Sequence, residues 1–312
     1  MQELDKAASE YRKGVVYALA GYIMWGFFPI YWRAFKNISS YEILAERVVW
    51  AFAFMIVMIA VSGNWQEFMD ETKTLLADKK QTMILAAAGV CVTLNWLGFI
   101  VAVNMGKTIQ TSLGYYINPL VSILFGVYYF KERLNIWTKI SFVLATIGVL
   151  TMSVMVGEIP WISLFLAASF GIYGLLKKQV KVSVVTGLTL ETLVATPVCF
   201  GYIAYLYAQG VSGWQVSDNF SLFLLAISGA VTATPLLAFN AGAKRLPLNV
   251  VGFLQYVCPT ISLIIGIFVF HEEFTASHFL AFAFIWLALL IFSLSQTKFF
   301  NSWVDKLVGS RV

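Results

Sequence analysis

The hydrophobic positions of this 312-residue chain fall into long continuous runs, each bounded by charged or turn-forming residues. About 20 apolar residues in a helix span a bilayer core, whereas outer-membrane strands alternate apolar and polar positions over about 10 residues. The runs therefore predict an all-α polytopic membrane protein with ten transmembrane helices. We place them at residues 14–35, 42–62, 82–104, 109–130, 136–156, 160–176, 184–208, 220–243, 248–270 and 277–296.

The composition agrees with a lipid environment. The chain is 60% hydrophobic and 12% charged, against about 25% charged residues in an ordinary globular domain. Its net charge of +5 would suggest a nucleic-acid partner in a soluble protein, but the lysines and arginines lie in short connections between apolar runs. We therefore expect a bilayer as the partner of this chain and no nucleic acid.

The basic residues also predict an orientation. If the N-terminus lies on a side that we call side A, 17 of the 21 lysines and arginines lie on side A, three on side B, and Arg47 inside a span. The excess holds in each half of the chain separately, so one missed span in the middle would reverse it in one half. Basic connections face the cytoplasm, so both termini are predicted to be cytoplasmic.

Two polar stretches carry an amphipathic pattern. Residues 65–76 place apolar side chains on one helical face, and the tail at residues 297–312 repeats this pattern. We expect both to lie as helices in the cytoplasmic membrane interface, with a partner-binding role as the alternative.

An internal repeat divides the chain. Residues 112–134 align with residues 252–274 and share six identities, among them Pro119 with Pro259 and Tyr116 with Tyr256. We therefore predict a first five-helix repeat at residues 14–156 and a second at residues 160–296. An odd number of spans per repeat makes the second copy inverted, which is typical of secondary transporters.

The repeated prolines indicate where a substrate cavity could lie. A proline removes a backbone hydrogen bond, so Pro119 and Pro259 are predicted helix breaks, tolerated in a membrane where they face protein or a water-filled cavity. We expect polar and aromatic residues of these and neighbouring spans to line it, and helix packing with satisfied tyrosines is the alternative. The candidate substrate-binding residues are Tyr22, Trp25, Asn95, Trp96, Tyr115, Tyr116, Asn118, Tyr173, Asn240, Gln255 and Tyr256.

Charged residues inside spans form a second group of candidates. Glu46, Arg47 and Glu191 lie several residues inside predicted helices, where each charge costs on the order of +2.5 to +3.5 kcal/mol on insertion scales. Glu46 and Arg47 splay about 100° apart on a helix, which favours an interhelical partner for one of them. Structural ion pairing and a role in proton coupling or substrate contact remain two open interpretations.

The sequence gives little sign of catalytic or metal chemistry. Cys91, Cys199 and Cys258 lie in apolar runs without C-x-x-C pairing or a nearby histidine, so we expect core residues, no metal site and no cofactor. The two histidines and the lack of aspartate inside the spans leave no catalytic constellation. A membrane-embedded enzyme and a channel are the alternatives to a carrier, and both are less favoured.

Several stretches resemble one transporter family. GYYINPL, VYYFKER, the ETL of the seventh span, GFLQYVCPT, NWLGFIVAVN and AFAFIWLAL are similar to the RarD branch of the EamA, or drug/metabolite transporter, superfamily, over about residues 14–296. The resemblance implies a bacterial inner-membrane permease named for chloramphenicol sensitivity. It also implies a cavity between the third, fourth, eighth and ninth spans, with the first and sixth lining it.

These observations lead to one expected function. We expect a secondary transporter that moves a small amphiphilic metabolite, such as an amino acid, an aromatic compound or a drug, by alternating access. The sequence contains no Walker or kinase signature, so the energy would come from a substrate gradient or from protons. Glu46 and Glu191 are the carboxylates that we would test first for coupling.

Overall fold

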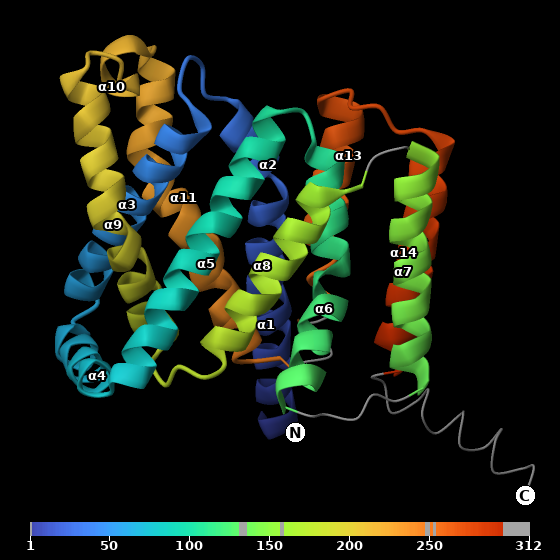
Figure 1. Cartoon of the computed structure of the whole chain (residues 1–312). Helices are drawn as coiled ribbons and strands as arrows, with labels where there is room; N and C mark the ends of the chain where they lie inside the picture. The colour runs from blue at the N-terminus through green and yellow to red at the C-terminus, as the bar shows by residue number, and fades with distance from the viewer. Residues whose placement is uncertain (1, 131–135, 157–158, 247–249, 252–253, 296–312) are drawn as a thin grey trace, which may run out of the picture.

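The computed structural model describes residues 2–130, 136–156, 159–246, 250–251 and 254–295, and every regular element within them is helical (Figure 1). The predicted tail helix at residues 297–312 lies outside these residues. The helices that coincide with the predicted runs are α1 (Gln2–Gly26) with α2 (Phe28–Arg33), α3 (Ser40–Val61), α5 (Lys79–Asn104), α6 (Thr108–Phe130), α7 (Ile136–Val156), α8 (Trp161–Lys177), α9 (Val184–Ala208), α11 (Asn219–Ala243), α13 (Val257–Ile264) with the π-helical turn η1 (Ile265–Val269), and α14 (Ala276–Ser295).

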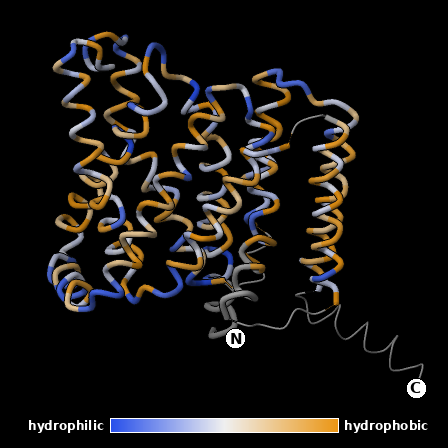
Figure 2. Tube along the Cα trace, viewed as in Figure 1, coloured by the Kyte–Doolittle hydropathy of each residue, from blue (hydrophilic) through white to orange (hydrophobic). Residues whose placement is uncertain are grey.

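Length and apolar character make this bundle a polytopic membrane protein. Seven described helical segments are long and apolar enough to cross a bilayer, and α8 and the α13–η1 segment are shorter apolar helices. Large apolar side chains such as Val57, Val198 and Phe268 are more than half exposed on the outside of the bundle. Figure 2 shows hydrophobic positions along the length of the helices and hydrophilic positions gathered at the two ends. This distribution suits a protein whose sides contact lipid.

Local sequence signals set the helix ends. The side chains of Ser39, Ser183 and Asp218 accept backbone hydrogen bonds at the starts of α3, α9 and α11, which satisfies amide groups that have no intrahelical partner. Gly63 and Gly210 follow α3 and α9 at φ +70° and +73°, a left-handed conformation that glycine adopts without a steric penalty. The second and seventh spans therefore end in the same way in both halves of the chain.

Helix packing follows a two-fold pattern. The contact of α1 with α11 has its counterpart in α8 with α5, α1 with α13 in α8 with α6, and α3 with α11 in α9 with α5. Three further contacts, α3 with α9, α6 with α13 and α7 with α14, map onto themselves when the halves are exchanged. These self-paired contacts are where corresponding spans of the two halves meet.

Hydrogen bonds at the ends of the bundle join segments that the charge pattern assigned to the same side. On side A, Gln81 at the start of α5 donates to the Gln179 carbonyl after α8, over 3.0 Å. On side B, Asn104 at the end of α5 donates to Ser40 at the start of α3, over 2.9 Å. The alternation of spans predicted from the sequence is therefore consistent with these contacts.

Two short helices close opposite ends of the bundle. The amphipathic helix α4 (Trp65–Ala77), at the lower left of Figure 1, buries Phe68 and Leu75 against α3, α5 and α9. Glu71 of α4 accepts hydrogen bonds from the Ser183 amide and hydroxyl over 2.9 and 2.8 Å. At side B, α10 (Gly213–Val216) lies between α9 and α11.

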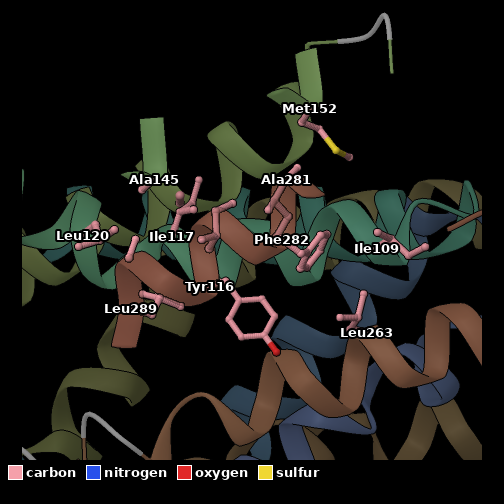
Figure 3. Close-up of a cluster of buried hydrophobic side chains, with 14 residues drawn as sticks. Ile109, Tyr116, Ile117, Leu120, Ala145, Met152, Leu263, Ala281, Phe282 and Leu289 are labelled. Atoms are coloured by element: carbon pink, nitrogen blue, oxygen red, sulfur yellow. The ribbon is translucent and has the colours of Figure 1, made fainter. Parts of the chain in front are cut away.

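The helices α7 and α14 pack along each other at one edge of the bundle (Figure 1). The buried cluster beside them includes Leu113 of α6, Met152 of α7 and Phe282 of α14. Figure 3 shows Tyr116 of α6 within this cluster, with its hydroxyl directed toward the helix that carries Leu263. The Tyr116 side chain therefore connects the pair of helices α7 and α14 at the edge to the helices at the centre of the bundle.

Candidate functional site

Arg47 is a buried cation surrounded by aromatic rings. It is the eighth residue of α3 and is 3% exposed. Its Cζ atom lies 4.2 Å from the ring centroid of Trp96, 4.7 Å from Trp32 and 5.6 Å from Phe28. Its Nε donates to the Thr232 hydroxyl over 3.1 Å. The structure thus brings together two predicted site residues, Arg47 and Trp96.

Glu46 points away from Arg47. One carboxylate oxygen accepts from the indole N–H of Trp214 over 2.6 Å, and the other accepts from that of Trp50 over 2.8 Å. One turn earlier, Glu42 accepts from the Ser212 hydroxyl over 2.8 Å. The two carboxylates therefore hold α10 against α3 at side B, and the splay of neighbouring residues on a helix separates Glu46 from Arg47.

Glu191 lies in a different cluster, toward side A. It is 1% exposed and forms an ion pair with Lys177 at the end of α8. The Tyr173 hydroxyl donates to its second oxygen over 3.1 Å. Two predicted residues, Tyr173 and Glu191, are thus in contact, and the charge of Glu191 is compensated by a lysine.

Asn95 and Tyr115 connect three spans. Asn95 of α5 is fully buried, and its amide donates to the Leu166 carbonyl over 3.0 Å and to the Ser169 hydroxyl over 2.9 Å, both on α8. The Tyr115 hydroxyl of α6 donates to the Asn95 side-chain oxygen over 3.4 Å. Both of these predicted residues are hydrogen-bonded inside the bundle.

Tyr116 and Tyr256, which the repeat alignment matches, meet in space. Their ring centroids lie 6.3 Å apart in a stacked arrangement, and the hydroxyls of Tyr116 and Thr260 are 2.7 Å apart. The buried Tyr256 hydroxyl has no hydrogen-bond partner among the described residues. Corresponding tyrosines of the two halves therefore face each other where α6 meets α13.

Tyr22 and Trp25 belong to an aromatic group at the C-terminal end of α1. Their ring centroids lie 5.8 Å apart, and both rings contact Phe239 of α11, at 5.4 and 5.6 Å. The Tyr22 hydroxyl lies 3.4 Å from the Val251 carbonyl, to which it donates. This group fills the contact between the first and eighth spans.

Three predicted polar residues are more dispersed. Asn118 is buried in α6, Asn240 donates to the Leu236 carbonyl of its own helix over 2.7 Å, and Gln255 lies in a turn before α13. The structure therefore places these three residues on three different elements, α6, α11 and the turn before α13.

The two prolines differ in their surroundings. Helix α6 runs without interruption past Pro119, whereas Pro259 lies in the first turn of α13, directly after the turn at Gln255 and Tyr256. The first turn of a helix tolerates proline because its amides have no intrahelical acceptor. The Ser112 hydroxyl of α6 donates to the Pro259 carbonyl over 2.7 Å.

A hollow of about 460 Å³ lies at side A, between α5 and α8. Its lining is mostly apolar, with Lys80 and Gln179 at the polar end. None of the predicted substrate residues lines it, and their side chains instead make the interior contacts described above.

Sequence reasoning missed several partners of the predicted residues. Trp32 and Thr232 contact Arg47, Lys177 pairs with Glu191, and Trp214 binds Glu46. Nothing in the sequence indicates that Trp214 belongs to this site, because its helix has only four residues and its sequence is typical of a loop. Glu272 is also new, because its carboxylate accepts from the first two amides of α6, each over 2.8 Å. Its alignment with Glu132 was the only signal in the sequence.

Comparisons with known proteins agree with this architecture. The model of the EamA-like transporter family matches the chain twice, at residues 12–154 and 159–294. An uncharacterized transporter of Bacillus subtilis, YojE, is 42% identical over 93% of this chain and 96% of its own. The protein RarD of Escherichia coli is 38% identical over 91% and 95%, and a chloramphenicol-sensitive protein RarD of Pseudomonas aeruginosa is 27% identical over 89% and 93%.

One crystal structure shares the fold with a TM-score of 0.56 at 14% identity, covering 89% of this chain and 96% of its own. The two family matches fall on the two halves of the helical bundle, and the relatives align over nearly their whole length. The resemblance seen in the sequence is therefore confirmed: the chain belongs to the EamA-like transporter family and is a membrane transporter of the RarD type.

Proposed function

We propose that this protein is a secondary transporter that moves a small amphiphilic metabolite across the bacterial inner membrane by alternating access. The observation that carries the proposal is the set of helix contacts that exchange with one another when the two halves are swapped. Two nearly equivalent halves of opposite orientation can adopt two mirrored arrangements of similar energy. A carrier needs such a pair of states, whereas a rigid membrane protein does not need a second state.

The interior chemistry supports an amphiphilic cargo. Aromatic side chains such as Trp25, Trp96 and Tyr256 pack in the same interior that holds buried polar groups such as Asn95 and Arg47. A site with a mostly apolar surface and a few placed polar groups is typical of small-molecule binding. We propose that these residues contact the substrate when the bundle opens.

We further propose that both termini face the cytoplasm, so that side A is the cytoplasmic side. The excess of lysine and arginine on side A supports this orientation. Segments with this excess, such as the start of α1 and the end of α11, are joined by the ion pair of Glu10 with Arg245, at 3.0 Å. The basic segments assigned to side A are thus in contact with one another, and we propose that they face the cytoplasm together.

We assign proton coupling to Glu191. Its partner Lys177 is 27% exposed at side A, so water at that end can reach the cluster. Both oxygens of Glu46, by contrast, are covered by indole N–H groups. A carboxylate that exchanges between a proton and a lysine partner can link protonation to the conformation of α8 and α9.

Transport in proteoliposomes tests the proposal. Metabolites that raise the melting temperature of the purified protein are loaded inside, and counterflow is measured with and without a pH gradient. We expect uptake to saturate with substrate concentration and to be faster when substrate is present inside the vesicles. We also expect a pH gradient to drive uptake. In Glu191→Gln we expect counterflow to continue, while the dependence on the pH gradient is lost.

Three results would contradict parts of this proposal. Flux that does not saturate and carries a steady conductance would indicate a channel. No exchange of any stabilising metabolite would contradict the carrier. Intact pH-gradient dependence in Glu191→Gln, with the wild type as the reference in the same lipids, would remove Glu191 from the coupling step and leave the carrier in place.

A further inference from the structure

Arg47 lacks the partner that a charge at its depth ordinarily has. Charged side chains inside membrane spans usually pair with an opposite charge or serve a function. In the part of the chain that the structure describes, no carboxylate lies within 4 Å of its guanidinium nitrogens, and its hydrogen bond is to the neutral Thr232 hydroxyl. Its electrostatic neighbours, Tyr31 and Tyr115, are neutral phenols. No described residue therefore compensates the positive charge.

The guanidinium is directed into the bundle. The starts of α3 and α11 both lie at side B, because Glu42 binds Ser212 and the Lys36 amide binds Ser221. Gly229 of α11 lies against Trp50, one turn beyond Arg47, and Thr232 lies almost one further turn along α11. To reach Thr232, the Arg47 side chain extends away from side B. A buried arginine more often extends toward the nearer interface, so this direction needs a reason.

The contacts of Arg47 leave its outer nitrogens available. The rings of Trp96, Trp32 and Phe28 pack around the guanidinium but accept no conventional hydrogen bond. Nε is used by Thr232. Among the described residues, no acceptor is hydrogen-bonded to the two terminal nitrogens, whose N–H groups form the fork that matches a carboxylate.

Two more buried donors in the same region have no partner. The indole N–H of Trp32 and the hydroxyl of Ser228 are unpaired among the described residues. The Trp32 ring lies 4.7 Å from the Arg47 Cζ atom, and Ser228 lies one turn from Thr232 on the same face of α11. A buried unpaired donor is costly. An anion beside the guanidinium would give these donors the acceptor that they lack among the described residues.

We propose that Arg47, with Trp32 and Ser228, binds the carboxylate of the transported substrate, and that this substrate is a monocarboxylate with an apolar or aromatic body. This proposal rests on the proposed transport function and adds the substrate class. The aromatic rings around Arg47 receive the apolar body. The guanidinium and the two unpaired donors receive the anion.

The same neighbours argue against a zwitterion. A substrate ammonium group needs a carboxylate or several acceptors, and both oxygens of Glu46, the nearest acid in the sequence, are occupied by indole N–H groups. A dianionic phosphate would place a second negative charge against one cation among aromatic rings. A single carboxylate balances the single charge of Arg47.

The test compares three probes of similar shape on the purified full-length protein. The probes are 3-phenylpropionate, its neutral amide 3-phenylpropionamide, and zwitterionic phenylalanine, with binding measured by calorimetry. We expect the carboxylate to bind at least tenfold more tightly than either of the other two. Equal binding of the carboxylate and the amide, equal binding of phenylalanine, or no binding of the carboxylate would overturn the proposal.

Four variants locate the site. In Arg47→Gln the carboxylate should bind no better than the amide, and Arg47→Lys should recover part of the preference because it restores charge without the fork. Trp32→Phe keeps an aromatic ring beside Arg47 but removes the N–H donor together with part of the indole, so both probes can bind more weakly, and the preference for the carboxylate over the amide should fall several-fold. Arg12→Gln, at an exposed arginine of α1, is the matched control and should behave as wild type.

Trp32→Phe keeps the test decisive if Arg47→Gln does not fold. A folded Arg47→Gln protein that still prefers the carboxylate would overturn the assignment, and so would a Trp32→Phe protein with an unchanged preference for the carboxylate over the amide. Counterflow of a neutral metabolite without any carboxylate preference would refute this site and leave the carrier intact. A carboxylate preference without counterflow of any solute would refute the carrier and leave the binding site.

Discussion

Gly229→Ala is expected to prevent stable assembly of the bundle. A Cβ atom at Gly229 would lie 2.0 Å from the Trp50 carbonyl oxygen and 2.7 Å from the Ala51 amide nitrogen. Both atoms belong to the backbone of α3, so no side-chain rotation relieves the clash, and α3 and α11 must separate. Overpacking ordinarily costs about 1–3 kcal/mol, and we expect at least about 3 kcal/mol here. Thermal unfolding in detergent and the yield of monodisperse protein measure the effect.

Gly201→Ala is the matched control for this prediction. Gly201 lies in α9, and an added Cβ would meet no atom within 4 Å. Because alanine favours a helix over glycine by about 1 kcal/mol, this variant should melt at the wild-type temperature or slightly above it. A Gly229→Ala protein as stable as Gly201→Ala would contradict the close approach of α3 and α11.

Lys177→Met is expected to destabilise the protein by about 3–5 kcal/mol, because it leaves Glu191 as an unpaired buried charge. Glu191 is 1% exposed, and the Tyr173 hydroxyl would be its remaining side-chain partner among the described residues. Methionine preserves most of the lysine side-chain volume, so the lost charge dominates the effect. The melting temperature in detergent near pH 7 should fall clearly below that of wild type.

A double-mutant cycle separates the ion pair from packing. Adding Glu191→Gln to Lys177→Met removes the stranded charge, so the double variant should recover most of the lost stability. The control is Lys13→Met, which breaks the exposed pair with Glu10 and should cost less than about 1 kcal/mol. Additive losses for Lys177→Met and Glu191→Gln would contradict a coupled buried pair.

The fold was predictable because its strongest determinants are local in the sequence. Apolar runs set the spans, and the positions of basic residues fixed their alternation, which the contacts at both ends respect. Glycine-terminated helices such as α3 and α9 follow the same local rules. Contacts between distant segments were less accessible: the stacking of Tyr116 on Tyr256 could be suspected from the repeat, but the binding of Trp214 to Glu46 could not.

The site residues illustrate the same limit. The burial of Glu46, Arg47 and Glu191 could be predicted from their positions inside apolar runs, because a charged side chain in a membrane span faces the protein interior rather than lipid. Their partners depend on which faces of the helices meet, and periodicity does not encode this. Lys177 was counted as a topology signal at side A, and its ion pair with Glu191 of the following helix, α9, appears only in the structure.

Alternating access predicts opposite movements at the two sides of the membrane. A substitution of Glu272 offers a way to shift the equilibrium between the two conformations. Its carboxylate in the second half accepts from the Thr108 and Ile109 amides in the first half and holds side B together. Glu272→Gln removes the charge at the helix N-terminus, which should shift the conformational equilibrium about tenfold, since a charge-assisted hydrogen bond contributes about 1.5–3 kcal/mol.

Spin-label distances test this central claim most directly. After Cys91, Cys199 and Cys258 are replaced by alanine, one label pair is placed at Met105 and Glu273 on side B, and another at Ile136 and Lys244 on side A, all at exposed positions. With Glu272→Gln, we predict a longer side-B distance together with a shorter side-A distance. A changed side-B distance with an unchanged side-A distance would contradict alternation between two states. No change in either distance would contradict it as well.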